Sequence, residues 1–155
     1  MSNFADAIGF VLQNEGGYAN NPDDAGGETN FGISKAAYPN VDIKNLTRGG
    51  AEAIYQRDFW KFDAVNSQRV ATKLFDACVN MGTLRAVRQM QLALGAIEAG
   101  PIVADGIPGS ATIEAINAAD EERLIDEFKA RLCKYYSELN QPEFLLGWMR
   151  RAVRG

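Results

Sequence analysis

The feature that most constrains this chain is a change from helical periodicity to turn residues at Glu15. Apolar side chains at Phe4, Ile8 and Val11 recur at helical spacing, and Glu15 follows Val11 by four residues on the same face. The segment 16–33 is rich in Gly, Asn and Asp, which favour tight turns and hairpins. The sequence therefore predicts a helix that stops at the glycines, and a loop that folds back over its end.

Glu15 is an acid that interrupts an apolar stripe. A carboxyl group half-withdrawn from water ionises late and can give its proton to a leaving oxygen, which is what a general acid must do. The alternative is an exposed last-turn glutamate, the commoner environment for this residue type. The turn-rich loop is expected to bring Asp24 and Thr29 opposite Glu15 across a cleft, although Asp24 alone suits a turn and Thr29 alone suits the start of a strand.

Length and charge narrow the class of protein. The chain has 155 residues, of which 46% are hydrophobic and 23% charged, as expected for one globular domain. A net charge of -4 argues against nucleic-acid binding through phosphate contacts. The chain lacks an apolar run of about eighteen residues and a basic, apolar secretory signal, so we expect no stable membrane insertion and synthesis in the cytoplasm.

The absence of histidine excludes whole classes of chemistry. Triads that use histidine as the base and zinc sites with histidine ligands are impossible without it. Carboxylates must therefore carry any acid–base work, and no cluster of residues suggests a metal or an organic cofactor. The two cysteines, Cys78 and Cys133, fall on or near apolar stripes, which favours buried thiols, although a disulfide between them stays open.

The rest of the chain has mostly helical periodicity. It predicts a mainly helical α+β fold, with a small β-hairpin lobe near residues 18–33, a helical lobe, and a central helix over 67–81. In the last helix, Phe144, Leu145, Trp148 and Met149 are expected to face inward, with three arginines near the end. Helices are expected to begin near Thr47, Ser67, Thr83, Ser110, Asp120 and Pro142.

The spacing of the three polar residues resembles a known arrangement. Glu15, Asp24 and Thr29 are separated by eight and then four residues, which is similar to the Glu-Asp-Thr site of phage lysozymes, with one fewer residue before the threonine. The fuller string resembles the signature of glycoside hydrolase family 108, the N-acetylmuramidases found as phage endolysins and bacterial lysozyme-like proteins. Its matching positions are Glu15 to Tyr18, Asn20, Pro22, Asp24, Gly26, Gly27, Thr29, Gly32 and Ile33.

Further matches extend over nearly the whole chain, and they imply its organisation. The Asp105 to Thr112 stretch resembles a turn of peptidoglycan-binding modules. The resemblance implies a single lysozyme-like domain over 1–155, with a catalytic half at 1–90 and a helical, peptidoglycan-binding-like half at 91–155. The other matching positions are Tyr55, Phe59, Trp60, Phe75, Asp76, Asn80, Gly82, Gln91, Leu94, Gly95, Gly147, Trp148 and Arg151.

The resemblance also implies an activity and a setting. A monomeric phage endolysin would hydrolyse the β-1,4 bond between N-acetylmuramic acid and N-acetylglucosamine and so lyse the host. It would stay in the host cytoplasm until a holin gave it access to the periplasm and cell wall. Glu15 would protonate the bridging oxygen, Asp24 would stabilise positive charge or orient a water molecule, and Thr29 would help to position that water. Inversion is favoured by analogy, but the carboxyl separation decides the stereochemistry.

Three further residues are candidates for binding substrate, each with an ordinary structural alternative. Tyr18 suits a sugar platform or a core aromatic. Asn80 is an amide in an otherwise apolar helix, so it needs either backbone partners or substrate hydroxyl groups. Arg151 suits peptidoglycan carboxylates, or helix carbonyls and acids nearby. For Asp105 and Thr112, bracing of their own turn is favoured over ligand binding.

Alternative functions lead to different products. A lytic transglycosylase uses one carboxyl group and leaves anhydro-muramyl ends, whereas a chitinase accepts unmodified N-acetylglucosamine polymer. A noncatalytic wall-binding module would bind peptidoglycan and release no reducing ends. The intact set of Glu15, Asp24 and Thr29 argues against the last of these.

Overall fold

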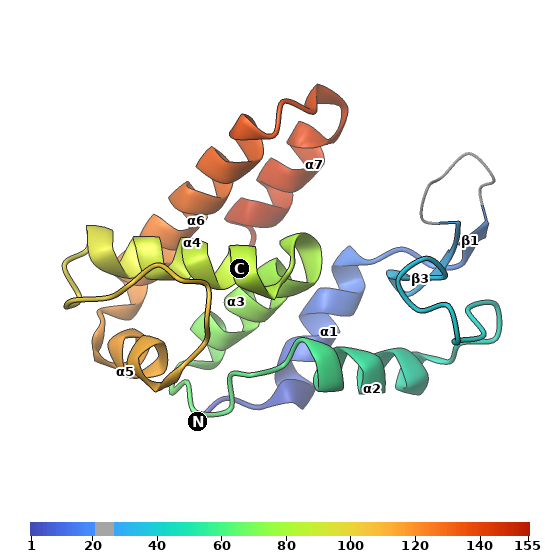
Figure 1. Ribbon diagram of the computed structural model, residues 1–155, viewed down its shortest axis with the longest axis horizontal. Coiled ribbons are helices and arrows are strands. Elements are labelled where there is room, and N and C mark those ends of the chain that lie inside the picture. The colour runs from blue at the N-terminus through green and yellow to red at the C-terminus, as the bar shows by residue number, and fades with distance from the viewer. Residues whose placement is uncertain (21–26) are drawn as a thin grey trace.

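The computed structural model describes residues 1–20 and 27–155. Asp24 therefore lies outside the described residues. Within them the chain forms seven helices and a three-stranded sheet, which confirms the mainly helical α+β class. Figure 1 shows the sheet on one side of the first helix, α1, and the two last helices, α6 and α7, on the other. No helix of this part is long and apolar enough to cross a membrane.

Helix α1 (Phe4–Asn14) positions Glu15. The side chain of Asn3 caps its start by accepting from the backbone N–H of Asp6, and Ala7, Ile8 and Val11 are buried. The helix ends one residue before the glutamate, rather than at the glycines. Glu15 has an extended backbone, with φ -95° and ψ 143°, so it is the residue at which the chain turns away from the helix axis.

The sheet confirms the small β lobe near residues 18–33. Strands β1 (Ala19–Asn20), β2 (Glu28–Asn30) and β3 (Ile33–Ser34) are antiparallel and pair in that order. Between β2 and β3 the chain reverses within two residues, Phe31 at φ 51° and Gly32 at φ 76°. Two positive φ values in a two-residue loop are typical of the tightest hairpin turn, whose twist matches that of the strands.

Helix α3 (Gln68–Met81) is the core helix, as the breadth of its apolar stripe predicts. It packs against α1 on one side and α4 (Thr83–Ala96) on the other. The hydroxyl of Ser67 caps it by accepting from the N–H of Val70, and Thr47 caps α2 (Arg48–Asp58) in the same way. Thr83 and Ser110 do not act as caps, because each helix begins at that residue and a glycine precedes it.

Helices α5 (Ser110–Ala118), α6 (Glu121–Glu138) and α7 (Pro142–Val153) complete the chain. Helices α6 and α7 pack against each other, and α6 also packs against α4 (Figure 1). The expectation for Phe144 is wrong, since 55% of this residue is exposed, although its ring still approaches that of Trp148. Cys78 is buried and Cys133 is partly buried, and both are free thiols.

The turn between Asp105 and Thr112 is braced by a buried glutamine, Gln91. Its amide nitrogen donates to the Asp105 carboxylate at 2.8 Å and the Thr112 hydroxyl at 3.0 Å, and its oxygen accepts from the N–H of Gly106 at 2.8 Å. The N–H of Ile107, followed by Gln91, holds the pKa of Asp105 below its usual range. The polar side chains of this turn are thus engaged with one another, which is the bracing role that the sequence favours.

A buried lysine fixes the end of α7. Lys73 of α3 is 3% exposed, and its ammonium group donates to the carbonyl oxygens of Arg151 at 2.8 Å and Arg154 at 2.6 Å. These carbonyls have no partner within a helix that is ending, so the lysine satisfies them. Burial lowers the pKa of Lys73 from 10.5 to about 8, partly opposed by the charge of Asp76.

The lowered pKa of Lys73 predicts a pH dependence of stability. The folded state binds this proton more weakly than the unfolded chain, so between about pH 8 and 10.5 the unfolded chain holds more protons and stability rises with pH. Urea unfolding of the wild type and Lys73→Met at about pH 7.5 and 9.5 isolates the effect, since other groups cancel. The unfolding free energy of the wild type minus that of Lys73→Met should be larger at the higher pH. An unchanged or opposite shift would contradict the assignment.

Candidate active site

The carboxyl group of Glu15 meets an arginine that comes from the far end of the chain. Nη2 of Arg151, on α7, lies 2.9 Å from Oε1 of Glu15 and 2.8 Å from Oδ1 of Asp76, on α3. Nε of the same guanidinium also contacts both carboxylate oxygens of Asp76, at 3.1 and 3.2 Å. One arginine thus joins three helix segments, and Asp76 takes the larger share of its hydrogen bonds.

This cluster is largely removed from solvent. The exposed fraction of the side chain is 17% for Glu15, 13% for Arg151 and 3% for Asp76. Burial acts to lower the pKa of Arg151, but the two carboxylates outweigh it and raise that pKa, so the guanidinium stays charged. Asn14 adds to the cluster by donating to Asp76 at 3.1 Å. The cluster can hold the Glu15 carboxyl in one place while leaving part of it accessible.

The hairpin turn covers the other oxygen of Glu15. A Cβ atom added to Gly32 would lie 2.6 Å from the Tyr55 hydroxyl oxygen and closer still to Oε2 of Glu15. Tyr55, on α2, donates its hydroxyl hydrogen to the Phe31 carbonyl oxygen at 2.9 Å, which ties the turn to the helical lobe. Burial, and then the charge of Glu15, raises the pKa of Tyr55. Glu15 therefore lies between the β2–β3 turn and the end of α7.

The structure places the other candidate residues in different surroundings. Thr29 is half-buried on the middle strand, paired with Ala19 and Ser34, and makes no hydrogen bond to Glu15 in the described residues. Tyr18 is 46% exposed, and its hydroxyl donates to Glu28 at 2.8 Å, so it is no core aromatic. The position of Asp24 relative to Glu15 is outside the described residues.

Asn80, on α3, and Arg151, on α7, lie close together. Both line a pocket of about 320 Å³ at the end of α7. Oδ1 of Asn80 accepts from the Tyr136 hydroxyl, and burial raises the pKa of that tyrosine. The sequence leaves open whether Arg151 contacts acids or substrate, and the structure shows its guanidinium between two acids.

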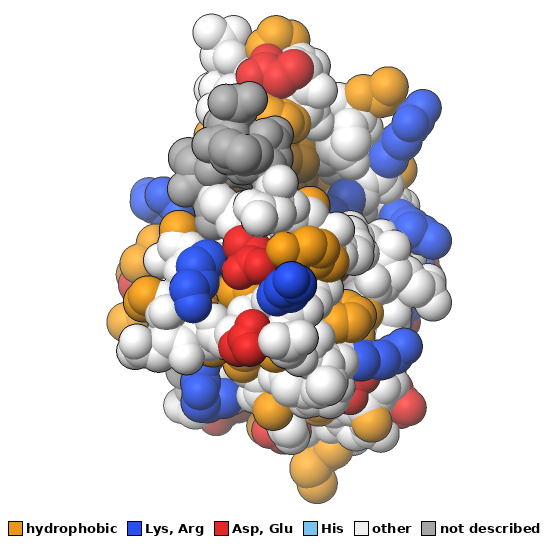
Figure 2. Space-filling view, turned by 90° about the vertical axis from the view of Figure 1, so that its right-hand side faces the viewer, with side chains coloured by type: hydrophobic (Ala, Val, Ile, Leu, Met, Phe, Trp, Pro, Cys, Tyr) orange, Lys and Arg blue, Asp and Glu red, His pale blue; other side chains and the backbone are white. Residues whose placement is uncertain are grey.

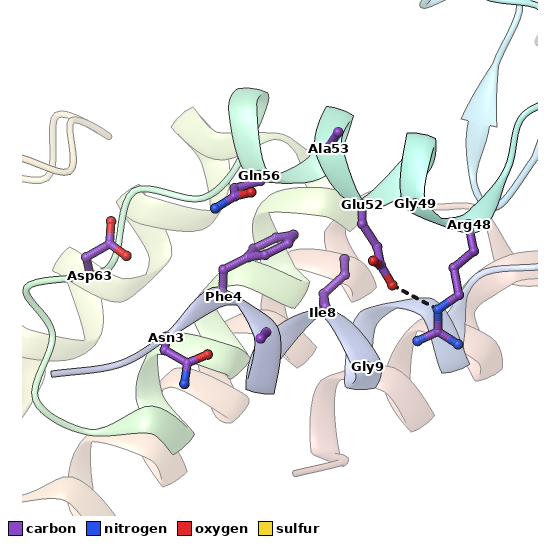
Figure 3. Close-up of a pocket in the computed structure, with 11 residues that line it drawn as sticks. Asn3, Phe4, Ile8, Gly9, Arg48, Gly49, Glu52, Ala53, Gln56 and Asp63 are labelled. Carbon is purple, nitrogen blue, oxygen red and sulfur yellow. Dashed lines mark hydrogen bonds and ion pairs between the residues drawn. The ribbon is translucent and has the colours of Figure 1, made fainter.

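A larger groove lies elsewhere on α1. Its volume is about 650 Å³, and Figure 3 shows it between the first half of α1 and α2, with Phe4 and Ile8 pointing into it. Arg48 and Glu52 form an ion pair at its rim, at 2.8 Å. None of the residues around Glu15 lines this groove. Its size alone therefore does not make it the site of acid chemistry.

The molecular surface on the side of the sheet carries mixed charges. Figure 2 shows acidic and basic side chains interspersed there, with hydrophobic side chains between them. No single-sign field extends over the part of this face that the structure describes. This pattern agrees with a net charge of only -4, and it leaves recognition of a ligand to local groups.

Asp76, Tyr55 and Asn14 were not predicted as residues of the site, although the first two are among the positions that resemble the family. A polar residue on the broad apolar stripe of α3 was the available signal for Asp76, because a buried charge needs a partner. No local pattern identifies Tyr55 as the anchor of the hairpin turn, since that contact joins residues 24 positions apart.

The fold and this carboxyl site define a lysozyme-like α+β protein. The solved structure of SagA from Brucella abortus matches with a TM-score of 0.82 and 29% sequence identity, over 97% of this chain and 90% of that one. The family model "Glycosyl hydrolase 108" matches residues 8–82, and "Predicted Peptidoglycan domain" matches residues 85–153. No curated protein matches the sequence significantly. A glycosyl hydrolase 108 match followed by a peptidoglycan-domain match indicates peptidoglycan-degrading activity and supports a glycoside hydrolase.

The tight approach of the hairpin predicts that Gly32→Ala damages both stability and activity. The added methyl group meets Glu15 and Tyr55 in a backbone conformation that disfavours a side chain, at a cost of about 1–3 kcal/mol. Gly27→Ala is the matched control, because Gly27 also has a positive φ but no atom of the other described residues within 4 Å of an added Cβ. Urea unfolding and wall hydrolysis should show the larger loss for Gly32→Ala. Equal stabilities for the two variants would show that the contact with Glu15 is unimportant.

The buried ion pair predicts strong coupling between Arg151 and Asp76. Arg151→Met leaves an uncompensated buried carboxylate, which should cost about 3–5 kcal/mol of unfolding free energy. Asp76→Asn in the same chain removes that charge, so the double variant should recover part of the loss. A double-mutant cycle from urea unfolding measures the coupling. Additive effects would mean that the two residues do not interact in solution.

Proposed function

We propose that this protein is a lysozyme-type N-acetylmuramidase, which hydrolyses the β-1,4 bond between N-acetylmuramic acid and N-acetylglucosamine in peptidoglycan. The observation that supports this most is the placement of Glu15, a partly accessible carboxyl group held between the hairpin turn and α7. In this proposal residues 1–90 form the catalytic half and residues 91–155 the peptidoglycan-binding-like half.

Glu15 acts as the general acid in this mechanism. Breaking a glycosidic bond needs a proton on the leaving oxygen, and the chain has no histidine to supply it. Arg151 holds one carboxyl oxygen through Nη2, and the other faces the hairpin side. Because both neighbours are fixed by contacts of their own, the carboxyl group is oriented before substrate binds.

Asp24 and Thr29 complete the mechanism on the opposite side of the sugar. We assign Asp24 to stabilise positive charge at the anomeric carbon or to orient a water molecule there, and Thr29 to help position that water. Inversion is the outcome we favour, by analogy with phage lysozymes. Tyr18, which is exposed beside the sheet, suits stacking against a saccharide ring.

The biological setting belongs to the same proposal. The resemblance to phage enzymes supports a monomeric endolysin that waits in the host cytoplasm and reaches the periplasm and cell wall through a holin. Co-expression tests it, because expression should lyse host cells only together with a holin. Lysis without any holin would contradict this route to the wall.

The products separate this reaction from its alternatives. Mass spectrometry of digested walls should show muramic acid at new reducing ends. Anhydro-muramyl ends would instead indicate a lytic transglycosylase, and digestion of chitin oligomers would indicate a chitinase. Binding to walls with no release of fragments would indicate a noncatalytic module.

The role of Glu15 predicts that Glu15→Gln lowers kcat on purified peptidoglycan by about 100- to 10,000-fold. Glutamine keeps the size of the side chain but cannot donate a proton as an acid does. Glu114→Gln is the matched control, since that glutamate is exposed on α5 and is not one of the residues around Glu15. Circular dichroism and thermal melting check that both variants fold. Undiminished turnover by Glu15→Gln would dismiss Glu15 as the acid.

A further inference from the structure

The pocket at the end of α7 is lined on several sides by hydrogen-bond donors. It takes Arg150, Arg151, Arg154 and Trp148 from the end of the chain, and Asn14 and Asn80 from α1 and α3. Its residues thus come from both stretches that the family models match, apart from Arg154 just beyond them. Because Arg151 also contacts Glu15, the pocket begins beside the proposed acid.

The charges of the three arginines are used differently. Arg151 is neutralised by Asp76, and its Nη2 also contacts Glu15, so it offers little to an incoming anion. Arg150 is exposed and makes no ion pair in the described residues. Arg154 donates to Oδ1 of Asn14 at 2.9 Å and lies 5.8 Å from the ring centre of Phe10, both neutral partners, and it makes no ion pair with any described residue. Two guanidinium groups therefore remain available at the pocket.

The remaining walls fit an extended polar ligand. Trp148 stacks on Tyr136 at 5.4 Å between ring centres, which fixes the indole as one wall. A second pocket of about 220 Å³ shares Asn80 and Trp148 with the first, and is also lined by Arg85. Because they share these two residues, the two pockets adjoin and form one continuous track. Arginines along such a track suit a chain that bears several carboxylates.

We propose that Arg150 and Arg154 bind the carboxylates of the peptide stem on N-acetylmuramic acid, and so make the enzyme prefer peptide-bearing peptidoglycan. This inference rests on the proposed muramidase function, because it places the stem next to the bond that Glu15 attacks. The peptide stem is the part of peptidoglycan that carries carboxylates away from the glycan chain. The free lactyl carboxylate, present only where the stem has been removed, is the other source of the same chemistry.

Hydrolysis of three substrates tests the proposal. They are intact peptidoglycan, peptidoglycan whose stem carboxylates have been converted to methylamides, and glycan stripped of peptide by an amidase. Arg150→Gln/Arg154→Gln should raise KM on intact peptidoglycan by about three- to tenfold, with kcat unchanged. It should behave like the wild type on the methylamide substrate. Arg123→Gln is the matched control, since Arg123 is exposed on α6 and lines neither pocket.

A binding measurement keeps this test independent of catalysis. In the Glu15→Gln background, pelleting with intact peptidoglycan should weaken by a similar factor when both arginines are replaced, and by less at high salt. Unchanged KM and unchanged pelleting would overturn the proposal, and so would a defect confined to the stripped glycan, which retains only lactyl carboxylates. If the wild type cleaved nothing while pelleting still depended on Arg150 and Arg154, the muramidase function would fail and the carboxylate site would stand.

Discussion

The structure depends on one buried carboxylate that needs a cation. Asp76 lies in the core helix with almost no exposed surface, and an unpaired charge there would be strongly destabilising. The chain supplies the partner from Arg151, 75 residues later, and this contact brings the last helix to the end of the first. Lys73 reinforces it from the same helix by holding the final carbonyls of α7. The arginine that neutralises the buried Asp76 therefore also holds Glu15 in place.

This arrangement makes the two halves of the chain depend on each other. The first half carries Glu15 and the hairpin, but the carboxyl group of Glu15 is oriented by an arginine of the second half. The pocket beside it is likewise lined by residues of both halves. If residues 91–155 recognise peptidoglycan and Glu15 is the acid, as we propose, this contact would couple binding of the wall polymer to its cleavage. The proposed stem pocket and the proposed acid would then lie next to each other, because Arg151 lines the pocket and also contacts Glu15.

Much of the fold, and the location of the proposed acid, could be predicted from local sequence patterns. Helical periodicity ending in turn residues located Glu15 at a helix end, and capping residues such as Thr47 marked where helices begin. The pairing of Asp76 with Arg151 could not be predicted, because a distant contact leaves no trace in local spacing. Phe144 was misplaced for a related reason: an apolar residue at helical spacing faces solvent when no neighbouring element covers it. The mutual placement of the proposed catalytic residues remains a prediction.

The most direct test of this account is a crystal structure of the Glu15→Gln variant with a peptide-bearing peptidoglycan fragment bound. We expect the amide of residue 15 within hydrogen-bonding distance of a glycosidic oxygen, Asp24 across the sugar from it, and the stem along the pocket at the end of α7. A fragment bound in the groove between α1 and α2, with residue 15 in contact with no part of the sugar chain, would contradict the account.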